Sequence, residues 1–187
     1  MVAAFLRAEL ASTRFGDDLR AVLRSLGADE ARLADPGVTD ARTEALRARV
    51  LGAHRGYRRD RGVFAGLPDG LTWYAAELSR ADLAVVRCVD YSYWNALTDD
   101  THLVGRAVAN IRRGRTVFDV PNDRFFALAD EIRRGAHAYE PMILYGTPLT
   151  ILEGHLRAVA LGLAGERAPA AIPVIVGLAH RAPAPHT

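Results

Sequence analysis

The first 56 residues carry hydrophobic side chains three and four positions apart, the period of an amphipathic helix. Two sets come first: Val2, Phe5, Leu6 and Leu10, then Leu19, Val22, Leu23 and Leu26 before Gly27. A third begins after the Asp-Pro-Gly sequence, where Thr39 or Asp40 can cap a helix. The pattern predicts a helical region over residues 1–56. Three arginines on the outer side of its last helix are expected to be solvated: Arg42, Arg47 and Arg49.

The pattern is interrupted by the sequence GYRRDRGVFAGLPDG, which predicts a linker over residues 57–70 and a solvated Arg-Arg-Asp-Arg cluster at 58–61. Beyond it, LTWYAAEL at 71–78 alternates as a strand does. Ser79 with Asp82 can start a short helix. The β-branched run AVVRCV at 84–89 predicts a buried strand.

The last third of the chain is the most regular. Helices are expected over 102–114 and 122–135, each ended by a glycine. The expected elements that follow are a strand at PMILY, a Gly-Thr-Pro turn, a strand at LTIL, a helix over 155–164 and a strand over 172–178. Strands alternating with helices predict an α/β domain over 71–180, followed by a flexible tail at 181–187.

Composition narrows the possibilities. The 187 residues are 50% hydrophobic, enough for a sizeable core. All 24 basic residues are arginines, and against 22 acidic residues the net charge of +2 does not indicate DNA binding. The single cysteine, Cys88, excludes an intrachain disulfide and a cysteine-rich zinc site. Because no apolar run reaches 18 residues, we expect a cytoplasmic protein without a signal peptide or a membrane span.

The sequence ILEGHLR at 151–157 is the strongest candidate site. A strand that enters a helix through Gly154 brings free backbone N–H groups and the positive end of the helix dipole to one place, which favours anions. Arg157 adds a planar fork suited to phosphate oxygens. Glu153 suits a proton acceptor, a metal ligand or an arginine partner. In the alternative interpretation, Glu153 pairs with a nearby arginine and His155 simply begins the helix, facing solvent.

The same region resembles a known family through short motifs in a fixed order. They are Leu128-Ala129, Ile132, Gly135, Pro141-Met142-Ile143, Gly154-His155-Leu156-Arg157, Leu163-Ala164-Gly165 and Ile172-Pro173-Val174. Over about residues 115–178 the chain is similar to the ParB-like N-terminal domain shared by chromosome-partitioning ParB proteins, free-serine kinases and sulfiredoxins. The resemblance implies a small mixed sheet with flanking helices, in which the turn after the glycine binds nucleotide phosphates.

Two positions depart from this family. His155 stands where sulfiredoxins have their reactive cysteine, which rules out their thiol chemistry there. Leu156 replaces a second polar residue, so one phosphate contact is missing. A partitioning role is not expected, because the helix-turn-helix and dimerisation regions that follow this domain in partitioning proteins are not found in the sequence.

A second candidate region, DYSYWNAL, follows the predicted strand at 84–89. Tyr91 and Trp94 could stack on a base or cover a substrate, with Asp90 and Asn95 as polar partners. Alternatively, these rings pack the N-terminal helices onto the sheet. Asp99 and Asp100 are interpreted as exposed loop residues. Further along, Asn122 can cap a helix and Arg124 is a second candidate anion contact.

These observations lead to two functional hypotheses. The first is a nucleotide-binding enzyme that transfers a phosphoryl group to a small hydroxyl-bearing substrate or hydrolyses the nucleotide, using ATP, ADP or CTP with Mg²⁺. In it, Gly154, Arg157 and Arg124 hold phosphate, Tyr91, Trp94 and Asn95 hold the base or substrate, and Glu153, His155 or Asp90 acts as the base. The second is a non-catalytic module that senses a nucleotide or phosphometabolite for a partner. The sequence identifies neither metal ligands nor the oligomeric state.

Overall fold

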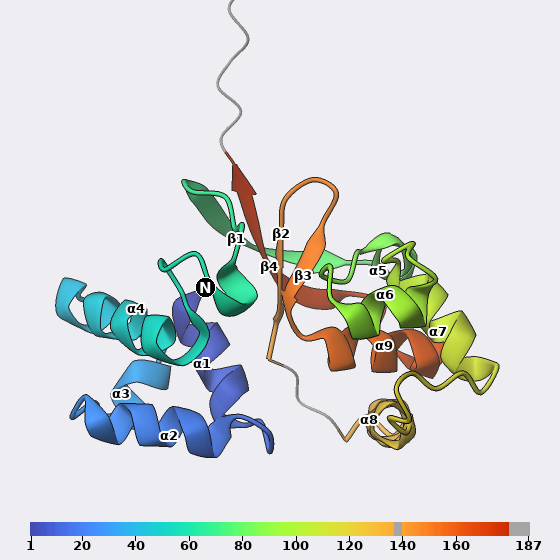
Figure 1. Ribbon diagram of the computed structural model, residues 1–187, viewed down its shortest axis with the longest axis horizontal. Helices are drawn as coiled ribbons and strands as arrows, with labels where there is room; N and C mark the ends of the chain where they lie inside the picture. The colour runs from blue at the N-terminus through green and yellow to red at the C-terminus, as the bar shows by residue number, and fades with distance from the viewer. Residues whose placement is uncertain (137–139, 180–187) are drawn as a thin grey trace, which may run out of the picture. The chain divides into compact units, whose positions relative to one another are not determined.

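The computed structural model describes residues 1–136 and 140–179 (Figure 1). The chain divides into two compact units, Met1–Asp69 (unit 1) and Gly70–Thr187 (unit 2). The tail predicted at 181–187 lies outside the described residues. Within the described ranges, no helix has the length and apolar character needed to cross a membrane.

Unit 1 is helical, as the periodicity predicts. Its elements are α1 (Val2–Leu10), α2 (Gly16–Ser25), α3 (Glu30–Ala34), α4 (Ala41–Arg55) and a single 3-10 turn, η1 (Gly62–Phe64). The first helix contacts each of the other three. Asp40 caps α4, because its carboxylate accepts hydrogen bonds from the Thr43 backbone N–H at 3.0 Å and from the Thr43 hydroxyl at 2.7 Å.

The segment expected to be a linker belongs to unit 1 as far as Asp69. Phe64 is buried, and its ring centroid lies 5.2 Å from that of Phe5 and 5.1 Å from that of Tyr57. An aromatic side chain within a glycine-rich, charged stretch therefore anchors the stretch to the helices. Composition alone indicated only its irregular backbone.

The prediction of a solvated Arg47 is wrong. Its side chain is 1% exposed, and its guanidinium donates to the carbonyl oxygens of Leu33 at 2.8 Å and Val38 at 2.6 Å. It also bonds to the Asp35 carbonyl and to the carboxylate of Glu44. A helix of five residues, α3, leaves its last carbonyls without intrahelical partners. The five guanidinium donors of one arginine supply those partners from α4.

Unit 2 contains a mixed four-stranded sheet in the order β1-β4-β2-β3. The long edge strand β1 (Leu71–Leu78) pairs antiparallel with β4 (Ile172–Ala179) along its whole length, so that Leu71 lies opposite Ala179. β2 (Met142–Tyr145) runs parallel to β4, and β3 (Thr150–Glu153) returns antiparallel to β2. The predicted α/β class, with helices preceding the sheet, is confirmed at this level.

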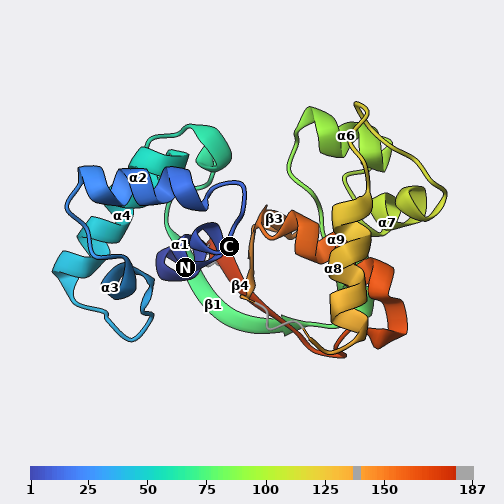
Figure 2. The ribbon, with the colours of Figure 1, turned by 90° about the horizontal axis from the view of Figure 1, so that it is seen from below.

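The helices of unit 2 gather beside one part of the sheet (Figures 1 and 2). They are α5 (Arg80–Val85), α6 (Ser92–Thr98), α7 (Val104–Arg112), α8 (Asp123–Arg133) and α9 (His155–Ala164), with the 3-10 turn η2 (Gly165–Arg167) after the last. α9 packs against both α7 and α8 and also contacts β2. Gly162 permits the close contact with α7, because a Cβ there would lie 2.6 Å from a methyl of Val108. The apolar core of unit 2 therefore surrounds α9.

The strand predicted over 84–89 is not formed. Ser79 and Asp82 make the expected capping box, and the helix that they start, α5, extends through Val85. Only Arg87 then makes isolated bridges, to Leu103 and Thr150. The cap starts the helix locally, and the helix takes up Ala84 and Val85, the first two residues of the expected strand. Cys88 is buried as expected, although it lies in no strand.

Candidate functional site

The turn that joins β3 to α9 has a backbone that requires glycine. Gly154 has φ of 103°, and a Cβ at this position would lie 2.9 Å from Cγ of Met142 on the neighbouring strand. Gly154 also occupies the N-cap of α9, where no side chain caps the helix. The N–H groups of the first turn of α9 consequently have no intrahelical partner and lie at the positive end of the helix dipole.

Arg157 lies in that first turn and reaches back along it. Its guanidinium donates to the backbone carbonyl of Glu140 and lies 3.5 Å from a carboxylate oxygen of Glu153. The two side chains are only 14% and 20% exposed. Glu153 therefore has an arginine partner, one of the roles left open by the sequence. The pair places one cation and one anion at the same helix end.

His155 is partly buried in unit 2. Its ring stacks on that of Trp94 with centroids 5.0 Å apart and planes at 20°. Its Nε2 accepts a hydrogen bond from the backbone N–H of Val89 at 3.3 Å. Burial lowers its pKa to about 3, because a charged imidazolium loses hydration there. His155 is consequently neutral at pH 7, with its proton on Nδ1.

Trp94 joins three helices of unit 2. Besides His155 of α9, its ring meets Tyr93 of α6 at 5.1 Å and Phe125 of α8 at 6.3 Å, both edge to face. These contacts make Trp94 a packing residue between helices of unit 2, whereas the alternative interpretation had the rings packing the N-terminal helices onto the sheet. Tyr91, by contrast, has a 61% exposed side chain at the start of α6.

The polar residues of this stretch bond mainly to one another. The Asn95 amide donates to the Asp90 carboxylate at 2.7 Å, and its oxygen accepts from the Tyr91 backbone N–H at 3.2 Å. This arrangement closes the start of α6.

Arg124, at the start of α8, is exposed. Burial raises the pKa of Tyr93, and the positive charge of Arg124 opposes that rise.

Asp99 has a larger structural role than the sequence indicates. Its carboxylate accepts hydrogen bonds from the Arg106 guanidinium at 2.6 Å, from the Asn110 amide at 2.9 Å and from Arg115. These bonds hold the pKa of the carboxyl far below its usual range. Asp99 therefore joins the ends of α6 and α7. Its partners are distant in sequence and fit no short motif, so only the fold reveals them.

The described residues include no cluster of three or more His, Cys, Asp or Glu side chains that could hold a metal ion. Burial raises the pKa of the Cys88 thiol to about 12, so this sulfur remains protonated and unreactive at pH 7.

The chain has no match among protein-family models, curated proteins or solved structures. Only its geometry and the motifs in the sequence therefore support the candidate site.

Proposed function

We propose that unit 2 is a ParB-like domain that binds a phosphate-bearing small molecule, in the first instance a nucleotide, at the start of α9. The observation that carries this proposal is the position of Arg157 in the first turn of a helix whose N-terminus no side chain caps. Backbone N–H groups and an arginine fork at one helix end are a favourable combination for phosphate oxygens.

The order of elements supports the family resemblance. The helix α8, the strand β2, the return strand β3, the glycine turn, the helix α9 and the strand β4 follow one another as the motifs require. The motif residues with buried side chains in the described part include Ala129, Ile132, Met142, Leu163 and Val174. These short motifs therefore supply packing positions of one hydrophobic core.

Phosphate binding would exchange one anion for another at Arg157. In the free protein the guanidinium pairs with the Glu153 carboxylate. An incoming phosphate carries more charge and can accept two parallel N–H bonds, so it competes with that carboxylate for the fork. Glu153 therefore tunes the affinity, because any ligand has to displace it.

The contacts favour a binding module over an enzyme. The pKa of His155 lies far below 7, and its Nε2 already accepts the Val89 N–H, which leaves it poorly suited to be a general base. Asp90 bonds to Asn95, and Glu153 pairs with Arg157. The function proposed is non-catalytic sensing of a nucleotide or phosphometabolite.

Isothermal titration calorimetry with ATP, ADP, CTP and GTP, with and without Mg²⁺, tests the site. We expect heat with at least one nucleotide, about tenfold weaker binding in Arg157→Ala because a charge-assisted hydrogen bond is lost, and tighter binding in Glu153→Gln. Arg112→Ala is the matched control, because Arg112 donates to the Gly162 carbonyl at the opposite end of α9.

No heat with any nucleotide, or equal heat with wild type and Arg157→Ala, would contradict the site. Chromatography of the same mixtures after prolonged incubation separates the two functional hypotheses. Unchanged nucleotide is expected from a sensor, and release or transfer of phosphate would restore the enzymatic hypothesis.

A further inference from the structure

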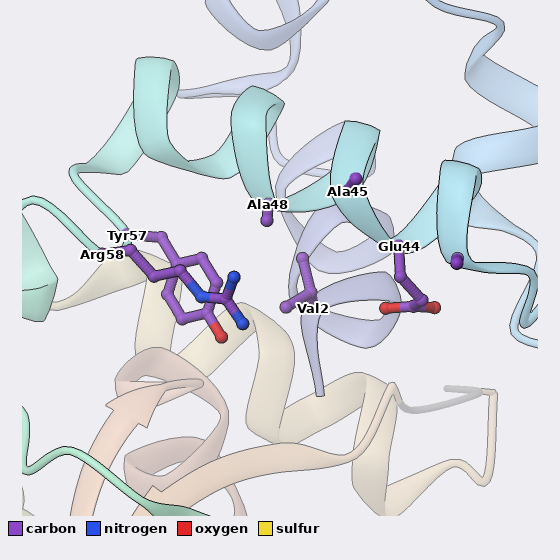
Figure 3. Close-up of a pocket in the computed structure, with 7 residues that line it drawn as sticks. Val2, Glu44, Ala45, Ala48, Tyr57 and Arg58 are labelled. Carbon is purple, nitrogen blue, oxygen red and sulfur yellow. The ribbon is translucent and has the colours of Figure 1, made fainter.

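Unit 1 contains a pocket that the proposed function does not use (Figure 3). Its volume is about 340 Å³, within the range of small-molecule sites. It lies against one face of α4, where small side chains leave space. The lining residues are Val2, Ala41, Glu44, Ala45, Ala48, Tyr57 and Arg58.

The two ends of this pocket differ in charge. In Figure 3, Tyr57 and Arg58 lie at one end, Glu44 lies at the other, and Val2, Ala45 and Ala48 lie between them. The middle of the pocket is therefore apolar, and a cation and an anion lie at opposite ends.

The anionic end is already neutralised. Glu44 pairs with Arg47, whose side chain is almost fully buried and is held in place by backbone carbonyls. A rigid, buried cation fixes the Glu44 carboxylate and offsets its charge. This end has little need of a cationic ligand, and its guanidinium is already bound to carbonyls and to Glu44.

The cationic end is open. Among the residues that the structure describes, the Arg58 guanidinium makes no hydrogen bond or ion pair, and its carbon lies 5.4 Å from the centroid of the Tyr57 ring. The Tyr57 ring itself is fixed by an edge contact with Phe64, which is buried. Arg58 has φ of 56°, an unusual backbone for a residue with a side chain. Because no described residue bonds to it, the Arg58 guanidinium keeps its N–H donors for an external acceptor.

We propose that this pocket binds a small monocarboxylate with an aliphatic body. The carboxylate bonds to the Arg58 fork and the Tyr57 hydroxyl, and the aliphatic chain lies along Val2, Ala45 and Ala48. A dicarboxylate is disfavoured, because its second carboxylate would lose hydration at an end whose guanidinium is already bound. This site lies wholly within unit 1, so its test is independent of the site proposed in unit 2.

The test is an NMR titration of the full chain with hexanoate, observed at the methyl groups of Val2, Ala45 and Ala48. Saturable shifts with a dissociation constant on the order of 1 mM or tighter are expected for a ligand of this size. Hexylamine should produce no saturable shift at these methyls. Adipate should bind about fivefold more weakly than hexanoate, because its second carboxylate loses hydration without gaining a new donor.

Three variants define the site. Arg58→Gln should weaken hexanoate binding about tenfold through loss of a charge-assisted bond, and Ala45→Leu should abolish it by filling the pocket. Arg49→Gln, an exposed α4 arginine outside the pocket, should leave it unchanged. Binding that survives Ala45→Leu, equal binding of hexylamine, or no saturable shift with hexanoate would overturn the proposal.

Discussion

Arg47 of unit 1 and Arg157 of unit 2 are both largely buried, and each donates to backbone carbonyls. Arg47 is 1% exposed and its donors are taken up by carbonyls around α3 and by Glu44. Arg157 bonds to one carbonyl and to Glu153, and 14% of its side chain remains accessible. A guanidinium bound to several carbonyls is a structural element. One paired with a carboxylate at a helix end that no side chain caps would, under the proposed function, exchange that partner for phosphate.

The two units also differ in what holds them together. Unit 1 combines its helices with buried polar contacts, including Glu9 and His54, whose carboxylate and imidazole lie 2.7 Å apart. Unit 2 is organised around the apolar helix α9, which α7 and α8 flank. Polar contacts of this kind depend on a few donors, whereas the stabilisation of an apolar core is spread over many side chains. Single substitutions should therefore affect the two units differently.

The largest effect is expected from Arg47→Ala. It leaves several buried carbonyls and Glu44 without their donor, which should cost about 4 kcal/mol of unfolding free energy. Both tryptophans, Trp73 and Trp94, lie in unit 2. In urea denaturation, loss of helix followed by circular dichroism should therefore precede the change in tryptophan fluorescence. The exposed Arg49→Ala is the control, and coincident transitions in Arg47→Ala would contradict the comparison.

A smaller effect is expected on the unfolding free energy of unit 2 when the pH is lowered. His155 has a folded pKa of about 3 against an ordinary value of 6.5, so below pH 6.5 the unfolded chain binds a proton that the folded chain does not. The unfolding free energy should fall by roughly 2.5 kcal/mol between pH 6.5 and 4.5 and continue to fall towards pH 3. Tryptophan fluorescence measures it. His155→Gln should lose this component, and an unchanged pH slope in that variant would refute the assignment.

Gly162→Ala tests the packing of α9 against α7. The added methyl would lie 2.6 Å from Val108, and the resulting strain outweighs the gain in helix propensity. We expect a net loss of about 1–2 kcal/mol. Chemical denaturation followed by tryptophan fluorescence should show this loss, and the double variant Gly162→Ala with Val108→Ala should recover part of it. A stabilised single variant would show that α7 moves aside freely.

The smallest effect is expected from Ser79→Ala, which removes the cap of α5. Ser79 Oγ accepts a hydrogen bond from the Asp82 backbone N–H at 3.1 Å, and the Asp82 carboxylate accepts one from the Ser79 backbone N–H at 3.0 Å. Loss of the hydroxyl should cost about 1 kcal/mol. Thermal unfolding should therefore begin at a slightly lower temperature, and Ser79→Thr should restore it. A loss as large as that of Arg47→Ala would indicate that unit 2 also depends on single polar contacts.

Local patterns in the sequence were sufficient for many of the elements. The helix expected over 155–164 is α9 with the same bounds, and the strands near 71–78 and 172–178 are β1 and β4. Ser79 was predicted to start a helix and Thr39 or Asp40 to cap one, and the caps found are Ser79 and Asp40, because a cap and its N–H partner lie within one turn. Apolar spacing and caps act over a few residues, so the sequence displays them directly.

Contacts between distant residues depended on tertiary structure. The carbonyls that bury Arg47 lie 9 to 15 residues away in sequence, and the stack of His155 on Trp94 joins two separate helices. An arginine or a histidine is the same in sequence whether solvent or protein surrounds it, and its burial depends on which elements fold against it. The sequence thus determined the candidate phosphate turn and most of the helices and strands. Only the fold decided that Arg157 pairs with Glu153, that His155 is neutral and that Arg47 is structural.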